Sequence, residues 1–123
     1  MVSNDNLKKL TNELLQLSRY AEEQFEQVKS TKAEVDFLTV VKPFVNLVKG
    51  KSEIWAENTK QWIIDNKPRN VHVKQIDSTV ENLQLVSVQA FFPSTSRTRF
   101  INYIRSIDYV LNSVLKMKAN PKE

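Results

Sequence analysis

Apolar residues recur at steps of three and four along most of the chain, with polar residues between them. Because an α-helix has 3.6 residues per turn, this spacing gathers the apolar side chains on one face of a helix. The pattern predicts long amphipathic helices over about residues 4–29, 52–66, 73–91 and 96–118. Each needs a partner for its apolar face, which favours helix-on-helix packing. The expected core positions are Leu10, Leu14, Leu17, Phe25, Ile76, Leu83, Phe100, Ile104, Ile107 and Leu111.

The second of these helices contains both tryptophans of the chain. Trp55 and Trp62 lie seven residues apart, so their rings fall on nearly the same side of a helix. Ile54, Thr59 and Ile63 are expected to widen that face. Two indoles bring a large apolar area, so we expect the tryptophans to anchor the core. The alternative is that one ring lines a groove that receives a partner helix or a small apolar ligand.

The stretch of residues 35–50 is apolar almost all round and rich in β-branched residues, so by itself it is also compatible with a strand. Pro43 and the helical neighbours favour a short helix over about residues 35–49, kinked or restarted at the proline. Gly50 suits the left-handed position after the end of such a helix. Ser52 is then the expected N-cap of the tryptophan helix.

These elements predict an all-α fold, namely an up-and-down four-helix bundle with an additional short kinked helix at about residues 35–49. A length of 123 residues suits one domain, which we expect to span residues 1–123 with a frayed tail at about 119–123. The chain has one Gly and four Pro, too few for the many turns of an all-β fold.

The composition removes several kinds of chemistry. Without cysteine the chain has no disulfide, no thiolate nucleophile and no cysteine-based metal site. Its single histidine, His72, cannot supply a paired-histidine metal site, and one glycine cannot supply a phosphate-binding loop. We therefore expect no metal, no cofactor and no enzymatic activity. His72 and Gln75 stand instead where an N-cap and the third helical residue of a capping box would stand.

The formal net charge of +4 is concentrated near the C-terminus, because residues 67–123 carry nine basic and four acidic side chains. If the bundle brings the ends of two helices together, a basic patch there is suited to contact phosphates. The basic groups concerned are Lys67, Arg69, His72 and Lys74 at one helix junction, and Arg97, Arg99 and Arg105 at another. The competing interpretation is a solvated surface, with Arg99 in an ion pair with Asp36 or Glu57.

Short identities along the chain add a family resemblance. They are Asp36-Phe37, Lys42-Pro43, Trp55-Ala56-Glu57, Lys67-Pro68, Val71-His72 and Arg99-Phe100. Their order resembles the YppE-like family, whose members are uncharacterised short proteins of Gram-positive bacteria, over about residues 7–117. The resemblance implies a cytoplasmic, all-α, four-helix-bundle-like domain, and it implies no activity, because none is assigned to the family.

The sequence therefore predicts a cytoplasmic helical-bundle protein that acts as a non-catalytic protein-interaction module. No apolar run approaches the ~20 residues that span a bilayer, and the N-terminus has no apolar signal segment, so no membrane partner is expected. The expected partner is another protein, with a second copy of this chain, bound through the outer flank of residues 35–48, as one option. Weak nucleic-acid binding through the basic C-terminal half is the alternative.

Truncation of one indole tests the predicted core. Trp62→Ala should lower the free energy of unfolding by about 3–5 kcal/mol, because the loss of a large aromatic side chain from a core leaves a cavity. Denaturant unfolding of the two proteins measures the difference. An unchanged melting temperature would contradict a core position for Trp62.

Overall fold

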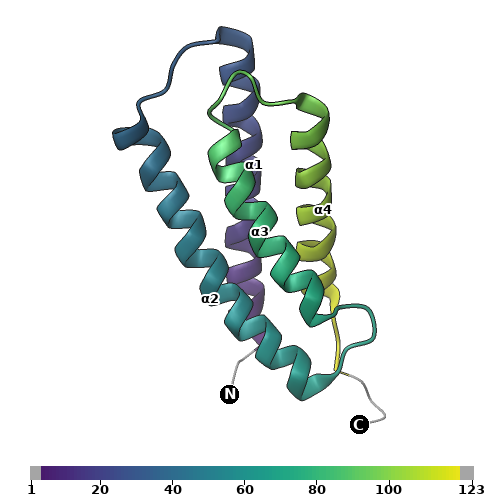
Figure 1. The fold of residues 1–123 in the computed structure, drawn as a ribbon. Helices are drawn as coiled ribbons and strands as arrows, with labels where there is room; N and C mark the ends of the chain where they lie inside the picture. Colours follow the sequence, from purple (N-terminus) through teal and green to yellow (C-terminus); the bar gives the residue numbers. More distant parts are fainter. Residues whose placement is uncertain (1–3, 120–123) are drawn as a thin grey trace.

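The computed structural model describes residues 4–119, and in this part of the chain four helices pack side by side (Figure 1). The elements are α1 (Asn4–Thr31), a short π-helical turn η1 (Phe37–Val41), α2 (Lys42–Asn66), α3 (Val73–Gln89) and α4 (Arg97–Lys116). Successive helices run in opposite directions, each packs against the next, and α4 returns to pack against α1. Residues 4–119 contain no strand. The predicted all-α, up-and-down four-helix bundle is confirmed.

The interior is filled by large apolar side chains from all four helices. Phe25 of α1 and Phe100 of α4 are fully buried and stack with their ring centroids 4.1 Å apart and their planes within 5°. Trp55 is fully buried, and Trp62 is 8% exposed. Of the ten positions expected in the core, eight are buried: Leu14, Phe25, Ile76, Leu83, Phe100, Ile104, Ile107 and Leu111. Leu10 and Leu17 are partly buried and pack against this core.

A buried chain of hydrogen bonds joins α2 to α1. The indole N–H of Trp55 donates to the hydroxyl of Thr11 at 3.0 Å, and that hydroxyl donates to the carbonyl oxygen of Leu7 at 2.6 Å. Thr11 and Trp55 are both fully buried. A buried polar group without a partner is costly, so these two hydrogen bonds allow a tryptophan to occupy the bundle centre.

α2 is one continuous helix, so the predicted break near residue 50 is wrong. Gly50 lies inside the helix with a negative φ and is exposed, and a Cβ atom placed on it would meet nothing within 4 Å. Ser52 is not an N-cap; its buried hydroxyl donates to the carbonyl of Lys49 at 3.1 Å. Packing of buried residues on both sides, Val48 and Trp55, outweighs the weak helix propensity of the glycine.

The stretch predicted as a short helix over about residues 35–49 is helical from Phe37 onward, first as η1 and then as the start of α2, which begins beside Pro43 as expected. The Asp36 carboxylate accepts the N–H of Leu38 at 3.1 Å, and the N–H of Val41 reaches back five residues to the Asp36 carbonyl at 3.3 Å. Pro43 follows in the first turn of α2. A proline ring clashes with the carbonyl four residues before it, here that of Thr39, and a wider turn relieves that contact.

The two left-handed helix ends are occupied by lysines. Lys32 follows α1 with φ 55°, and Lys67 follows α2 with φ 48°. Each N–H closes the preceding helix, with Lys32 donating to the Val28 carbonyl at 2.7 Å and Lys67 to that of Ile63 at 2.8 Å. α1 ends at Thr31 and α4 at Lys116, each within two residues of the expected end. Most of the tail that was expected to fray, residues 120–123, lies outside the described residues.

Ion pairs connect neighbouring helices at the surface. Arg19 of α1 pairs with Asp108 of α4, and Lys60 of α2 pairs with Asp77 of α3 at 2.8 Å. The hydrogen bond to Asp108 raises the pKa of Arg19, so the guanidinium stays charged. Exposed pairs of this kind contribute little stability each, about 0–1 kcal/mol. Along the described residues, no helix is both long enough and apolar enough to cross a membrane.

Two matched substitutions test the hydrogen bond between Trp55 and Thr11. Thr11→Val should lower the free energy of unfolding by about 1–3 kcal/mol, because it leaves the buried indole N–H without an acceptor. Thr59→Val should be neutral or stabilising, because the buried Thr59 hydroxyl has no hydrogen-bond partner among residues 4–119. Urea unfolding of both variants measures the contrast. Equal losses in the two would show that the hydrogen bond carries no special weight.

Gly50→Ala should raise the free energy of unfolding by about 0.5–1 kcal/mol. Alanine is the better helix former, and its methyl group would meet nothing within 4 Å of the Cβ position. Thermal unfolding at low protein concentration measures the change for the isolated chain. A decrease would mean that residue 50 is not helical in solution.

Candidate functional site

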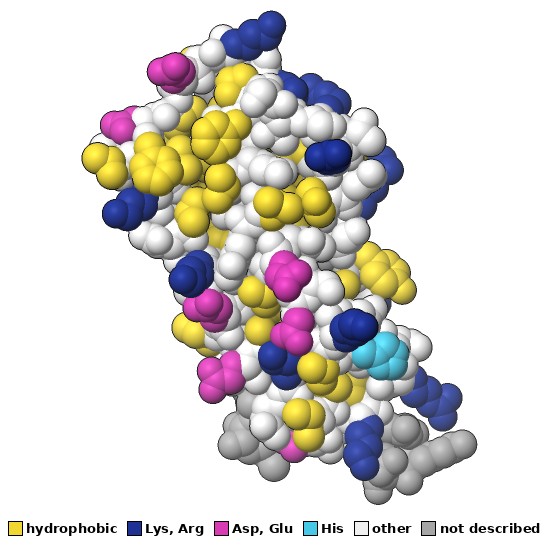
Figure 2. Space-filling view, viewed as in Figure 1, with side chains coloured by type: hydrophobic (Ala, Val, Ile, Leu, Met, Phe, Trp, Pro, Cys, Tyr) yellow, Lys and Arg dark blue, Asp and Glu magenta, His cyan; other side chains and the backbone are white. Residues whose placement is uncertain are grey.

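The outer surface of η1 and α2 exposes large apolar side chains. Phe37 is 56% exposed, Leu38 68%, Leu47 44%, Ile54 54% and Ile64 59%. Figure 2 shows apolar side chains gathered at the end of the molecule where η1 begins, with others further along α2. Soluble monomers expose single apolar residues routinely, whereas a contiguous group on one surface is typical of an interaction site.

The spacing on α2 shows that its apolar residues form two separate faces. Trp55 belongs to the face turned toward the bundle, whereas Pro43, Leu47, Gly50 and Ile54 lie at steps of four, three and four on the opposite, exposed side. We call these four residues the outer α2 seam. The expectation that Ile54 shares the buried face with the tryptophans is wrong. One face of α2 completes the core, and the seam has no covering element among the described residues.

Charged side chains beside the seam are ordered by sign along the helix. Lys42 and Lys49 lie before Gly50 in α2, and Glu53 and Glu57 follow after it. All four are exposed. Figure 2 shows this order over α2 as basic side chains nearer η1 and acidic ones further along the helix. The seam therefore has a positive and a negative half.

A shallow groove of about 440 Å³ lies beside the N-terminal end of the seam, between α1 and the start of α2. Tyr20 of α1 lies along it and contacts Phe44, with ring centroids 5.0 Å apart. Apolar side chains predominate in its lining, which consists of Leu17, Tyr20, Thr39, Val40, Pro43, Phe44 and Leu47. Such a lining suits an apolar side chain of a partner protein, and it holds no carboxylate, histidine or lysine.

The two basic clusters that the sequence suggested are not brought together. Lys67, Arg69 and His72 lie at the connection between α2 and α3, whereas Arg97 and Arg99 begin α4 at the other end of the bundle (Figure 1). Antiparallel packing of α3 and α4 enforces this separation. The single basic patch that would support nucleic-acid binding does not form.

The arginines at the start of α4 are placed differently from the expectation. Arg97 pairs with Glu26 of α1, and its guanidinium lies 5.5 Å from the centroid of the Phe25 ring. Arg99 is exposed, and no carboxylate of the described residues lies within ion-pair distance of it. The predicted ion pair of Arg99 with Asp36 or Glu57 is therefore wrong, because burial of the neighbouring Phe100 turns Arg99 outward.

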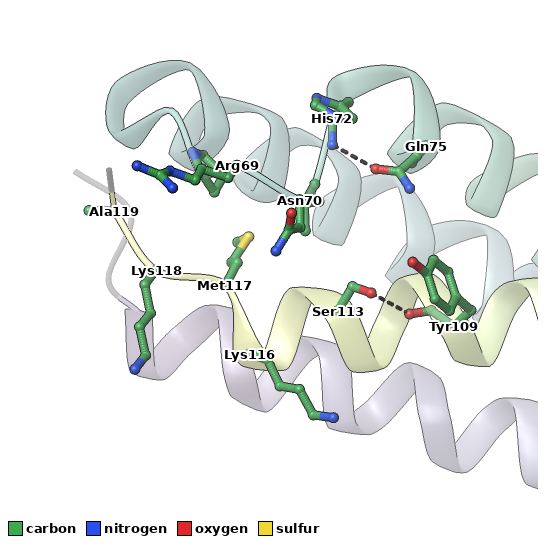
Figure 3. A pocket seen from close by; sticks show the side chains of 12 residues that line it. Arg69, Asn70, His72, Gln75, Tyr109, Ser113, Lys116, Met117, Lys118 and Ala119 are labelled. Carbon is green, nitrogen blue, oxygen red and sulfur yellow. Dashed lines mark hydrogen bonds between the residues drawn. The ribbon is translucent and has the colours of Figure 1, made fainter. Parts of the chain in front are cut away.

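A hollow of about 590 Å³ lies at the other end of the molecule, between the α2–α3 connection and the end of α4 (Figure 3). Arg69, Lys116 and Lys118 are among its lining residues, and none of the lining residues is acidic. The ammonium groups of the two lysines point away from the connection, and Arg69 extends toward Ala119. The cations therefore do not converge on one point, as a built phosphate site would require.

His72 is part of the helix junction at this hollow. Its backbone N–H donates to the side-chain oxygen of Gln75 at 2.8 Å, which is one half of the predicted capping box. The imidazole ring points away from α4 (Figure 3). In residues 4–119, no group of three or more histidine, aspartate or glutamate side chains is arranged to hold a metal ion.

The sequence reasoning reached only the N-terminal part of the outer α2 seam, as the outer flank of residues 35–48, and missed its continuation through Gly50 to Ile54. Leu47 and Ile54 continue the helical spacing that begins at Pro43, and Gly50 lies between them. The predicted helix end at Gly50 assigned the two halves of this pattern to different helices. A single helix through Gly50 would have revealed both apolar faces.

Comparisons with known proteins agree with the fold. The uncharacterized protein YppE of Bacillus subtilis (strain 168) is 23% identical over 108 residues, which are 88% of this chain and 88% of that protein. The crystal structure of B. subtilis yppE matches with a TM-score of 0.88 and 22% identity, covering 92% of each chain.

Two further crystal structures have the same bundle. A protein of unknown function from Listeria innocua matches with a TM-score of 0.87 and 23% identity, over 91% of this chain and 90% of that one. A structure from Staphylococcus aureus matches with a TM-score of 0.81 and 25% identity, over 90% and 94%. The family model described as "Bacterial domain of unknown function (DUF1798)" matches residues 11–117. The chain belongs to this DUF1798 family, and YppE is one of its relatives.

Proposed function

We propose that this protein is a cytoplasmic, non-catalytic protein-interaction module that binds its partner through the outer α2 seam and η1. The observation that carries the proposal is the exposure of Leu38, Leu47 and Ile54 on the outer side of η1 and α2, at 68%, 44% and 54%. The bundle needs none of these side chains for its own core. Their exposure to water is unfavourable, and contact with a partner would remove it.

The chemistry of this surface supports binding rather than catalysis. The groove beside the seam is lined mainly by apolar residues, and its polar groups are the hydroxyls of Tyr20 and Thr39. A catalytic site needs convergent acid, base or nucleophilic groups, and this lining supplies no such set. Weak nucleic-acid binding, the alternative from the sequence, has less support, because the two basic clusters face different ends of the bundle.

Site-specific photocrosslinking in cells tests the proposal and captures the partner whatever its identity. The photoreactive amino acid p-benzoylphenylalanine replaces Ile54 in one variant and Asn102 in the other. Both positions are exposed, but Asn102 lies on α4, away from the seam. We expect irradiation to give discrete protein adducts from position 54 and none of the same mass from position 102.

The protein identified in the adduct is then purified and titrated with the wild-type chain and with the Ile54→Lys variant. Loss of binding in the variant, at an unchanged melting temperature, completes the test. Adducts that are equal at the two positions, or absent from both, would contradict a contact surface on α2.

A further inference from the structure

We infer that the partner of the outer α2 seam is a second copy of this chain, with the two α2 helices packed antiparallel about a two-fold axis near Gly50. The inference rests on the proposed function and names the partner. In a two-fold contact the same surface is used by both copies, so it must be complementary to itself in shape and in charge. The seam meets both conditions.

The apolar residues are placed symmetrically about Gly50. Leu47 lies three residues before it and Ile54 four residues after it, so an antiparallel partner sets Leu47 of one copy against Ile54 of the other. Further out, Phe37 lies thirteen residues before Gly50 and Ile64 fourteen after it. These side chains are 44–59% exposed in the single chain. The two-fold pairing would cover Leu47 and Ile54, which lie on the seam itself, without any other partner.

The charges beside the seam are complementary to themselves in the same arrangement. Antiparallel pairing near Gly50 sets Lys42 of one copy near Glu57 of the other, and Lys49 near Glu53. All four side chains are exposed. Parallel pairing would instead oppose like charges, which is unfavourable. The order of the charges therefore favours a second, antiparallel copy of α2 as the partner over a helix of another protein that lacks this order.

Gly50 fits the point where the two helices would cross. Glycine inside an exposed helix is unfavourable by itself, yet here the only glycine of the chain lies in the middle of α2. No atom lies within 4 Å of the place where its Cβ would be, so the surface is open to a neighbour. The distance between packed helices depends on the side chains at the contact, and two glycines permit a close approach.

Sedimentation equilibrium of the full chain tests the inference. We expect a reversible monomer–dimer equilibrium for the wild type. For Ile54→Lys we expect a dimer dissociation constant at least about tenfold higher, because the variant loses a central apolar contact. The melting temperature of the variant at low concentration should be unchanged, because Ile54 is exposed in the single chain. Asn102→Lys adds the same charge on α4 and should leave the dimer unchanged.

Charge reversal distinguishes the antiparallel two-fold from other modes of self-association. The Lys42→Glu/Lys49→Glu variant and the Glu53→Lys/Glu57→Lys variant should each associate more weakly alone, because each would oppose like charges. An equimolar mixture of the two should form a heterodimer. Association that is equally strong in each variant alone and in the mixture would overturn the antiparallel arrangement.

A wild-type chain that stays monomeric at the concentration of an NMR sample would overturn the inference. It would leave the proposed function standing if photocrosslinking from position 54 gave an adduct with a different protein. An adduct with twice the mass of the chain supports both. Crosslinking with no preference for position 54 would remove the proposed function, whatever the oligomeric state.

Discussion

The hydrogen bond from the Trp55 indole to the Thr11 hydroxyl fixes the orientation of α2 in this bundle. Its donor is the largest side chain in the core, and its acceptor is itself held by the Leu7 carbonyl of α1. An indole N–H can only donate, so in an apolar interior it needs an acceptor such as this hydroxyl. Rotation of α2 about its axis would break this bond. The bond therefore also determines which residues of α2 face away from the bundle.

That outward face gives α2 two roles. Toward the bundle it buries Phe44, Val48 and Trp55, and away from the bundle it presents Leu47 and Ile54 to water. A helix that served only the fold would carry polar residues on the second face. In this chain the exposed apolar face, which is unfavourable for an isolated domain, is the feature on which the proposed binding role rests. The similar solved structures share the bundle and are of unknown function.

The long helices were predictable from the sequence because each has one apolar face with an unbroken period. α1, with Leu14 and Phe25, and α4, with Phe100 and Leu111, follow this rule. α2 does not, because it is apolar on two sides and contains Gly50, and local propensity then indicated a break that tertiary packing overrides. The outer flank of residues 35–48 was recognised from the sequence, but its continuation to Ile54 was not, because the helix was predicted to end between them. The separation of Arg69 from Arg97, by contrast, already follows from the predicted up-and-down topology, because successive connections in such a bundle lie at opposite ends.

The π-helical turn η1 has a consequence for how the length of this chain can vary. In this turn a backbone N–H donates to the carbonyl five residues before it, so the turn holds one residue more than an α-helical turn. Removing one residue would restore ordinary α-helix. The chain before that point would rotate by about 100° around the helix axis. That preceding chain is the mostly exposed connection from α1, whereas α2 after Pro43 is held in place by its buried face, with Phe44, Val48 and Trp55. Single-residue insertions and deletions should therefore be absorbed here, where they leave the bundle intact and change the presentation of Phe37 and Leu38.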